Sequence, residues 1–383
     1  MKNDKPVQII HDHADFHITQ IEGFESEVEQ IINEFIRPFN FNNAPYFRVG
    51  LIRLEEQKHI LIIDLHHIVT DGVSYDIFVR DLFALYSGEK LPNLKIQYKD
   101  YSEWQQSEKE KEIALKHEQY WLEQFKDGVP VLNMPTDYTR PEILDLKGSK
   151  ISFTIDSNVT KKIKRLLAKE ETTLYTLMLS VYNILLGKYT GQEDVVIGSP
   201  ITGRPHADLQ DIIGVFVNML GIRNYPRAEQ RFTQFLFEVK EQVLQAFEHQ
   251  KCQYEDLVNQ LGLQGTYNRN PLFDVSFVMQ NMDADHMFID GLELRTYDHD
   301  FKRAQMDLLL RVVELEDTIE LTMEYATSLY TRDTVQKLCE RYVEIFEQIV
   351  DHPEILLKDI SFKQEIQELQ PVKVSVDFGD FNF

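Results

Sequence analysis

Residues 66–72 read HHIVTDG, and these residue types could carry out proton chemistry. An imidazole changes its charge near neutral pH, so a histidine here could accept or donate a proton during a reaction. Asp71 and Gly72 stand at the expected start of a helix. There a carboxylate can accept hydrogen bonds from free N–H groups, and glycine permits a tight turn. These residue types are therefore compatible with a general base beside a capped helix.

His66 and His67 are adjacent, where a predicted strand (60–69) leads into a predicted helix (73–86). Successive strand side chains point to opposite faces, so only one of these imidazoles can enter a given site. We expect one histidine to be structural and the other to be available for chemistry. The other interpretation is a packed histidine pair followed by a helix cap, and spacing alone favours it.

A metal site is not expected from these residues. Adjacent histidines on a strand diverge, and no third ligand is close in the sequence, which argues against zinc. The two cysteines, Cys252 and Cys339, can form neither a disulfide framework nor a cysteine-based zinc site.

The amino-acid composition limits the kinds of molecule that this chain is expected to bind. The 383 residues include 40 Lys and Arg against 63 Asp and Glu, for a formal net charge of −23. Such a chain repels phosphates and no basic block offsets the charge, so nucleic acids and anionic membrane surfaces are not expected partners. No apolar run approaches the roughly 18 residues of a spanning helix, and the polar start does not resemble a signal peptide. We expect a cytoplasmic location and no membrane partner.

Two successive blocks of mixed strands and helices indicate an α/β protein of two lobes. The first block has predicted strands at 47–54 and 60–69 and helices at 25–36, 73–86 and 105–126. A stretch with three prolines, residues 129–147, shows no period and predicts a linker. The second block has predicted helices at 159–169, 174–188, 232–249 and 331–350, and strands at 151–155, 194–198, 273–281, 290–297, 306–314 and 318–326.

Five segments in order resemble the motifs of one family, the condensation domains of nonribosomal peptide synthetases. The segments are 66–72 (HHIVTDG, for HHxxxDG), 98–104 (YKDYSEW), 197–218 (IGSP, TGR and GVFVN), 249–255 (HQKCQYE) and 269–273 (RNPLF). Gln253 stands where the family usually has proline. The resemblance covers almost the whole chain, and the joint occurrence of these motifs is highly specific.

This resemblance implies an α/β fold of two chloramphenicol-acetyltransferase-like lobes that form a V-shaped pseudo-dimer. The predicted bounds are residues 1–137 for the N-terminal lobe, 138–148 for the linker, 149–362 for the C-terminal lobe and 363–383 for a tail. The family's two leading motifs, an early helix and a strand with Arg-His-Glu, should precede the region around residue 8 and are not found. We therefore expect the first lobe to lack its N-terminal start.

The reaction that the resemblance implies is amide formation between an acyl or peptidyl thioester donor and an aminoacyl thioester acceptor. Upstream and downstream peptidyl carrier proteins would present both on phosphopantetheine arms, next to a neighbouring adenylation domain, and the chain itself would bind no cofactor. His67 holds the catalytic position, and Gly72 would bring its backbone close to the reacting carbonyl. His66 is expected on the packed side, and Asp71 and Arg204 are expected to pair at the site.

Ser199 and Asn218 are candidates for the floor of the substrate tunnel. Three alternatives stay open: an acyl-CoA-dependent acyltransferase of the same fold, an epimerisation domain, and a non-catalytic remnant that docks carrier proteins. Tyr75 follows DGVS where epimerisation domains commonly have tryptophan, which favours condensation.

Overall fold

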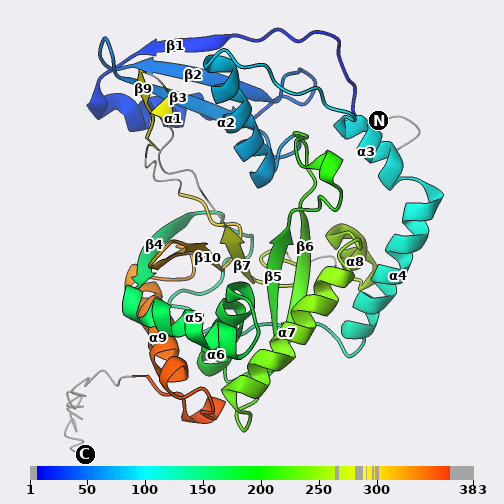
Figure 1. The fold of residues 1–383 in the computed structure, drawn as a ribbon, viewed down its shortest axis with the longest axis vertical. Helices are drawn as coiled ribbons and strands as arrows, with labels where there is room; N and C mark the ends of the chain where they lie inside the picture. Colours follow the sequence, from blue (N-terminus) through cyan, green and yellow to red (C-terminus); the bar gives the residue numbers. More distant parts are fainter. Residues whose placement is uncertain are drawn as a thin grey trace, which may run out of the picture.

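The computed structural model describes residues 7–263, 267–280, 288–289, 291–295, 297 and 302–362. The predicted tail, residues 363–383, lies outside this range. Figure 1 shows a small sheet at one end of the molecule and a larger sheet at the other, with helices α3 and α4 running along one side between them. The described residues thus form two α/β units, each built around its own sheet.

The small sheet has three strands in the order β1-β2-β3. They are β1 (Ile18–Glu22), β2 (Phe47–Arg53) and β3 (His59–Leu65). Strands β2 and β3, predicted at 47–54 and 60–69, pair antiparallel, while β1 lies parallel to β2. Helix α1 (Val28–Phe35) buries Val28, Ile32 and Phe35 against this sheet, because these positions recur on one helix face.

The larger sheet has six strands in the order β4-β11-β10-β7-β5-β6. They are β4 (Gly148–Ile155), β5 (Val195–Ile201), β6 (Asn218–Asn224), β7 (Val275–Gln280), β10 (Leu308–Glu314) and β11 (Ile319–Ala326). Strand β7 runs parallel to both β5 and β10, and the remaining pairs are antiparallel. Strand β5 lies between β7 and β6, so it is an interior strand of the sheet. The segment that follows it, residues 202–217, begins at the end of this interior strand.

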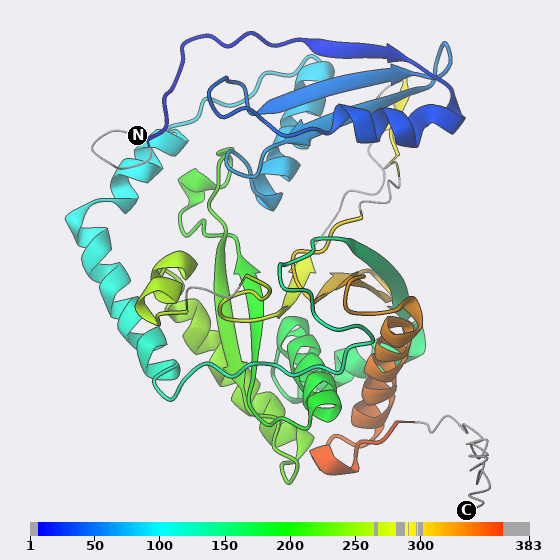
Figure 2. The same cartoon turned by 180° about the vertical axis from the view of Figure 1, so that it is seen from behind.

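Four helices cover the larger sheet, and they are α5 (Ser157–Lys169), α6 (Leu174–Thr190), α7 (Phe232–Glu248) and α9 (Arg332–Asp351). Figure 2 shows from behind that α6 and α9 lie on the side of this sheet away from the small sheet. Helix α6 is mostly apolar and almost wholly buried. Thr173 caps its start by accepting a hydrogen bond from Thr176 N–H, and Gly191 ends it with a φ of 68°.

Helices α2 (Gly72–Tyr86), α3 (Tyr98–Gln105) and α4 (Glu108–Gln124) connect the two sheets. The predicted helix at 105–126 corresponds to α4, which begins at Glu108 because Ser107 caps it by accepting a hydrogen bond from Glu110 N–H at 3.4 Å. Trp121 and Phe125 at the end of α4 lie in the core of the larger sheet, and the Trp121 indole donates to His249 O at 2.9 Å. The C-terminal end of α4 therefore packs with the second unit.

Strands β1 and β6 and helices α3 and α8 (Tyr254–Gln260) are among the elements that were not predicted. Strand β6 shows no hydrophobic pattern in the sequence, because Asn218, Arg223 and Asn224 are polar although they are buried. The predicted strand at 290–297 corresponds to a two-residue strand, β9 (Leu292–Glu293), which pairs with β8 (Phe288–Ile289), and part of that prediction lies outside the described residues. Among the described residues, no helix is both long and apolar enough to cross a membrane.

Candidate functional site

The two histidines lie in a turn after β3, and the prediction that the strand reaches residue 69 was wrong. Strand β3 ends at Leu65; His66 N–H still donates to Tyr46 O opposite it, and after His66 the backbone forms local hydrogen bonds. Ile68 N–H donates to His66 Nδ1 at 3.0 Å, and Val69 N–H donates to His66 O at 3.1 Å. The two imidazoles therefore point in different directions because of the turn, and not because side chains alternate along a strand.

His66 and His67 have different surroundings. The half-buried His66 ring meets Phe41 edge-on at a centroid distance of 4.8 Å and Phe39 at 5.7 Å. His67 is exposed, and within the described ranges its ring has no hydrogen-bond partner. The structure thus packs the first histidine and leaves the second accessible.

Asp71 caps helix α2 and also reaches the second unit. Its Oδ1 accepts hydrogen bonds from Ser74 N–H at 2.8 Å and from Arg204 Nη2 at 3.1 Å, while Oδ2 accepts from Phe216 N–H at 3.0 Å. Both members of the ion pair are buried, with side-chain exposures of 2% for Asp71 and 0% for Arg204. The predicted pairing of these two residues is therefore present in the structure.

Arg204 also organises its own segment, residues 202–217. Its Nη1 donates to Leu209 O and to Ile212 O, both at 2.6 Å, and its guanidinium carbon lies 4.0 Å from the centroid of the Phe216 ring. One side chain thus contacts three residues of this segment and also Asp71 at the start of α2. We call residues 202–217 the crossing segment.

Ser74 is a site residue that the sequence analysis missed. It is fully buried, and its hydroxyl lies 2.7 Å from both Asp71 Oδ1 and Gly214 O. The same hydroxyl accepts from Arg204 Nη2 at 2.9 Å and from Gly214 N–H at 3.0 Å. The available signal is its place three residues after a capping aspartate, on the same side of the helix start. That signal is common to many helices.

Two glycines allow close packing of the crossing segment, Gly203 within the segment itself and Gly214 against the first unit. Gly203 has a φ of 62°, and a Cβ atom there would lie 1.7 Å from Phe216 O. At Gly214 a Cβ would lie 2.1 Å from the Tyr98 ring, whose hydroxyl donates to Val215 O at 2.8 Å. The glycines of the sequence motif therefore serve close backbone packing.

Exposed ion pairs flank the buried pair. Arg80 of α2 lies 2.8 Å from Asp211, and Lys95 lies 2.9 Å from Asp208. Both acidic partners belong to the crossing segment. Since these side chains are largely in water, they add little stability and mainly favour this approach over others.

Gly72 differs from the two packed glycines. It is the first residue of α2 and is exposed, and a Cβ added to it would meet no atom within 4 Å. Neither a positive φ nor a close neighbour among the described residues requires glycine at this position. The missing side chain leaves free space one residue after Asp71 and five residues after His67.

Ser199 and Asn218 are buried, with their polar atoms bound to the protein. Ser199 Oγ donates to Phe277 O at 3.1 Å and lies 2.6 Å from the Tyr175 hydroxyl. The Asn218 amide donates to Gln250 O at 3.1 Å and Cys252 O at 2.6 Å, and its Oδ1 accepts from Met219 N–H and Tyr254 N–H. These contacts support a structural role for both side chains.

The electrostatics of the site favour a charged Asp71. Burial raises the pKa of Asp71, but the hydrogen bonds from Phe216 and Ser74 and the charge of Arg204 outweigh it and lower the pKa below its usual range. Asp71 is therefore a carboxylate at neutral pH and is not a proton donor. In the described part of the chain, no group of three or more His, Cys, Asp or Glu side chains is arranged to hold a metal ion.

The family model described as "Condensation domain" matches residues 1–369. The chain belongs to the condensation-domain family. Condensation domains of nonribosomal peptide synthetases form peptide bonds and are acyltransferase-type enzyme domains, so the predicted family and reaction class are confirmed.

This condensation domain is similar to segments of large synthetases. It is 40% identical over 365 residues to bacitracin synthase 3 of Bacillus licheniformis, and the match covers 95% of this chain and 6% of the synthase. It is also 40% identical over 380 residues to gramicidin S synthase 2 of Brevibacillus brevis, covering 99% of this chain and 8% of that protein. The chain thus spans under a tenth of the length of these two relatives.

Solved structures agree with the α/β condensation-domain fold. The X-domain in its complex with OxyB from teicoplanin biosynthesis has a TM-score of 0.85 at 24% identity, and the match covers 94% of this chain and 82% of that one. The four-domain nonribosomal peptide synthetase AB3403 has a TM-score of 0.81 at 22% identity, covering 91% of this chain and 28% of that one. At these sequence identities the structural similarity supports a shared fold.

Removing one partner of the Asp71–Arg204 pair should destabilise the domain strongly. Asp71→Asn and Arg204→Met should each cost about 3–5 kcal/mol of unfolding free energy, because the remaining partner stays buried without its counterion. A double-mutant cycle by urea denaturation should give a coupling of about 0.5–3 kcal/mol. The exposed pair Arg80–Asp211 is the matched control, with about 0–1 kcal/mol. Additive effects at Asp71 and Arg204 would contradict the contact.

The stability that Asp71 contributes should depend on pH. Because its pKa is lower in the folded state, the contribution is complete above the unfolded-state value of about 3.9 and is lost as pH falls through the folded-state value. The difference in unfolding free energy between wild type and Asp71→Asn should be constant from pH 5 to 8. Below about pH 4 it should shrink by up to about 1.4 kcal/mol per pH unit. A difference unchanged down to pH 3 would mean that Asp71 carries no such shift.

Proposed function

We propose that this domain joins two thioester substrates by an amide bond, with His67 beside the reacting amine and Gly72 beside the reacting carbonyl. The donor acyl or peptidyl group and the acceptor aminoacyl group would arrive on the phosphopantetheine arms of an upstream and a downstream peptidyl carrier protein. The observation that carries the proposal is the buried Asp71–Arg204 contact, which ties the turn with the accessible His67 to the second unit.

The chemistry requires little base strength. The acceptor amine attacks the donor thioester carbonyl, the C–S bond breaks, and the donor arm leaves as a thiol while the amine gives up a proton. An α-amine has a pKa of about 7.7–8.0, so roughly a tenth to a fifth is already unprotonated at pH 7. His67 is proposed to orient the amine and to accept its proton after the attack.

Positioning is proposed to be the larger contribution. Holding two tethered reactants in line can supply about 7–11 kcal/mol, whereas a general base typically contributes about 10²–10⁴-fold. A rigid contact between the two units serves the first purpose directly. Ser199 and Asn218 are proposed to support the tunnel floor through the protein contacts described above.

The architecture belongs to the same proposal. The two sheets with their helices would be the lobes of a V-shaped pseudo-dimer, with residues 1–137 in the first lobe, 138–148 as linker and 149–362 in the second. The domain would work in the cytoplasm beside an adenylation domain, and one similar structure is that of a four-domain nonribosomal peptide synthetase.

The test is an assay with two carrier proteins, one loaded with a donor and one with an acceptor. Amide formation supports condensation. Use of an acyl-CoA donor instead would identify the acyltransferase alternative, and inversion of a single loaded substrate would identify epimerisation. Carrier binding without turnover would identify a docking remnant.

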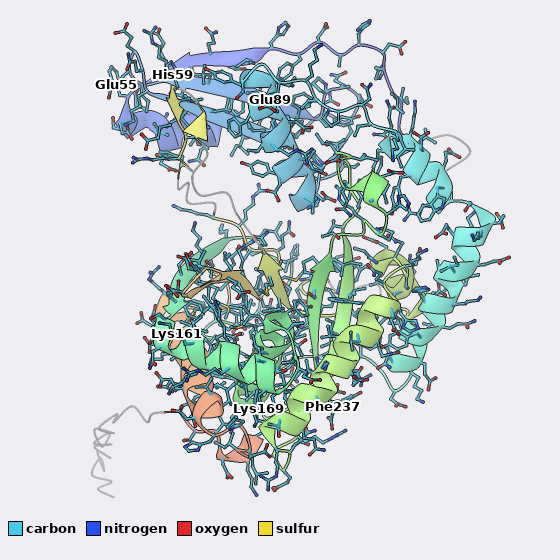
Figure 3. The ribbon with its side chains drawn as sticks, viewed as in Figure 1. Glu55, His59, Glu89, Lys161, Lys169 and Phe237 are labelled. Atoms are coloured by element: carbon cyan, nitrogen blue, oxygen red, sulfur yellow. The ribbon has the colours of Figure 1, made fainter. Side chains whose placement is uncertain are left out.

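Replacing His67 by alanine should lower amide formation about 10²–10⁴-fold, the range of lost general-base help. The melting temperature should stay the same, because the ring is exposed and unbonded within the described residues. His59→Ala is the matched control, since that histidine is also exposed and lies at the far end of β3 (Figure 3). Equal activity of the two variants would remove His67 from the reaction.

Gly72→Ala should separate stability from turnover. The protein has room for the methyl group and alanine is the better helix former, so the melting temperature should be unchanged or slightly higher. Single-turnover amide formation should fall at least tenfold if the reacting carbonyl approaches this backbone. Wild-type rates in Gly72→Ala would show that this space is not used by substrate.

A further inference from the structure

We propose that His66 is a positioning residue whose Nδ1 lone pair fixes the turn that presents His67. The inference rests on the proposed function, because it assigns a part in the same reaction to a side chain that touches no substrate. It goes beyond packing, since it names the atom that acts, the backbone group it holds and the tautomer it needs.

Two of the hydrogen bonds of residue 66 define a local turn, and another joins it to the residue that precedes β2. Its N–H donates to Tyr46 O at 3.0 Å, and its carbonyl accepts from Val69 N–H at 3.1 Å. Its Nδ1 accepts from Ile68 N–H at 3.0 Å. The last bond joins a side chain to the backbone two residues later, which is the pattern that asparagine and aspartate form in tight turns. His66 therefore does with a ring nitrogen what asparagine does with an oxygen.

The hydrogen bond determines the form of the imidazole. Since Nδ1 accepts, the proton of the neutral ring must be on Nε2. A protonated imidazole carries N–H groups at both positions and could not accept from Ile68. The turn therefore requires the neutral Nε2–H tautomer of His66.

Aromatic neighbours hold the ring in place for this bond. Phe39 and Phe41, from the segment between α1 and β2, meet it edge-on, and the Tyr46 hydroxyl donates to Phe41 O at 2.7 Å. The charged groups of this neighbourhood are Arg48, whose guanidinium carbon lies 4.0 Å from the centroid of the Phe39 ring, and Asp64, which pairs with Arg48 at 2.7 Å. The two charges compensate each other beside the ring.

The consequence falls on His67. Its own ring has no bond to the described residues, so its direction depends on the backbone between Leu65 and Ile68. That backbone is held on one side by β3 and on the other by the bond to His66 Nδ1. Loss of the bond would free the turn, and a misplacement of about 1 Å can cost about 10²-fold in rate.

Two variants separate the acceptor from the ring. His66→Asn keeps an acceptor for Ile68 N–H and removes the aromatic packing. His66→Phe keeps the aromatic packing and removes the acceptor. In the two-carrier assay, His66→Asn should retain amide formation within about tenfold of wild type despite a lower melting temperature. His66→Phe should melt close to wild type and lose about 10²-fold in rate.

Hydrogen exchange of the segment 66–70 gives a readout that does not need activity. Protection of Ile68 N–H should persist in His66→Asn and disappear in His66→Phe. If His66→Asn does not fold, His66→Phe decides alone: native melting with fast exchange supports the inference, and native melting with retained protection overturns it.

Three results would overturn the inference. One is a fully active His66→Phe. Another is a folded His66→Asn that keeps the protected turn but loses activity as strongly as His66→Phe, because the imidazole would then act in the reaction itself. The third is retained protection of Ile68 in His66→Phe. A wild-type domain inactive with both loaded carriers would refute the proposed function, and the exchange data would still decide the role of His66.

Discussion

The buried ion pair between Asp71 and Arg204 is the interaction on which the site depends. Removing both charges from water costs free energy. Hydrogen bonds offset this cost, because both oxygens of the carboxylate and most nitrogens of the guanidinium have partners. Those partners are backbone atoms of the crossing segment and the start of α2. The pair therefore holds two backbones at one relative position, and Ser74 adds a second bridge to the same place.

The same contact continues into the second unit. The crossing segment leads into β6, whose Asn218 holds the backbone of Gln250 and Cys252. The turn between these residues is bound by α4, where Lys251 lies 2.7 Å from Glu110. Figure 1 shows α4 running along the side of the molecule that joins the two sheets. The start of α2 is thus connected to a well-packed core, which suits a reaction whose rate depends on alignment.

Sequence patterns predicted most of the regular elements and the identity of the ion pair, for different reasons. Helix α6 was predicted correctly because its long apolar run is visible in the sequence without knowledge of the segments that pack against it. The Asp71–Arg204 contact spans 133 residues and was expected only because both residues stand in motifs of one family. Ser74 was missed because its partners are largely backbone atoms, which no sequence pattern displays. The end of β3 was misplaced because a side-chain acceptor, His66 Nδ1, competes with the ladder.

The most direct test of this account is amide hydrogen exchange across the whole domain in Arg204→Met. If the pair holds the first unit in place, exchange should accelerate in residues 66–74, although the substitution lies in the second unit. Faster exchange in residues 202–217 should accompany it. Acceleration confined to 202–217, with 66–74 as protected as in wild type, would contradict the claim that Arg204 positions the turn of His67.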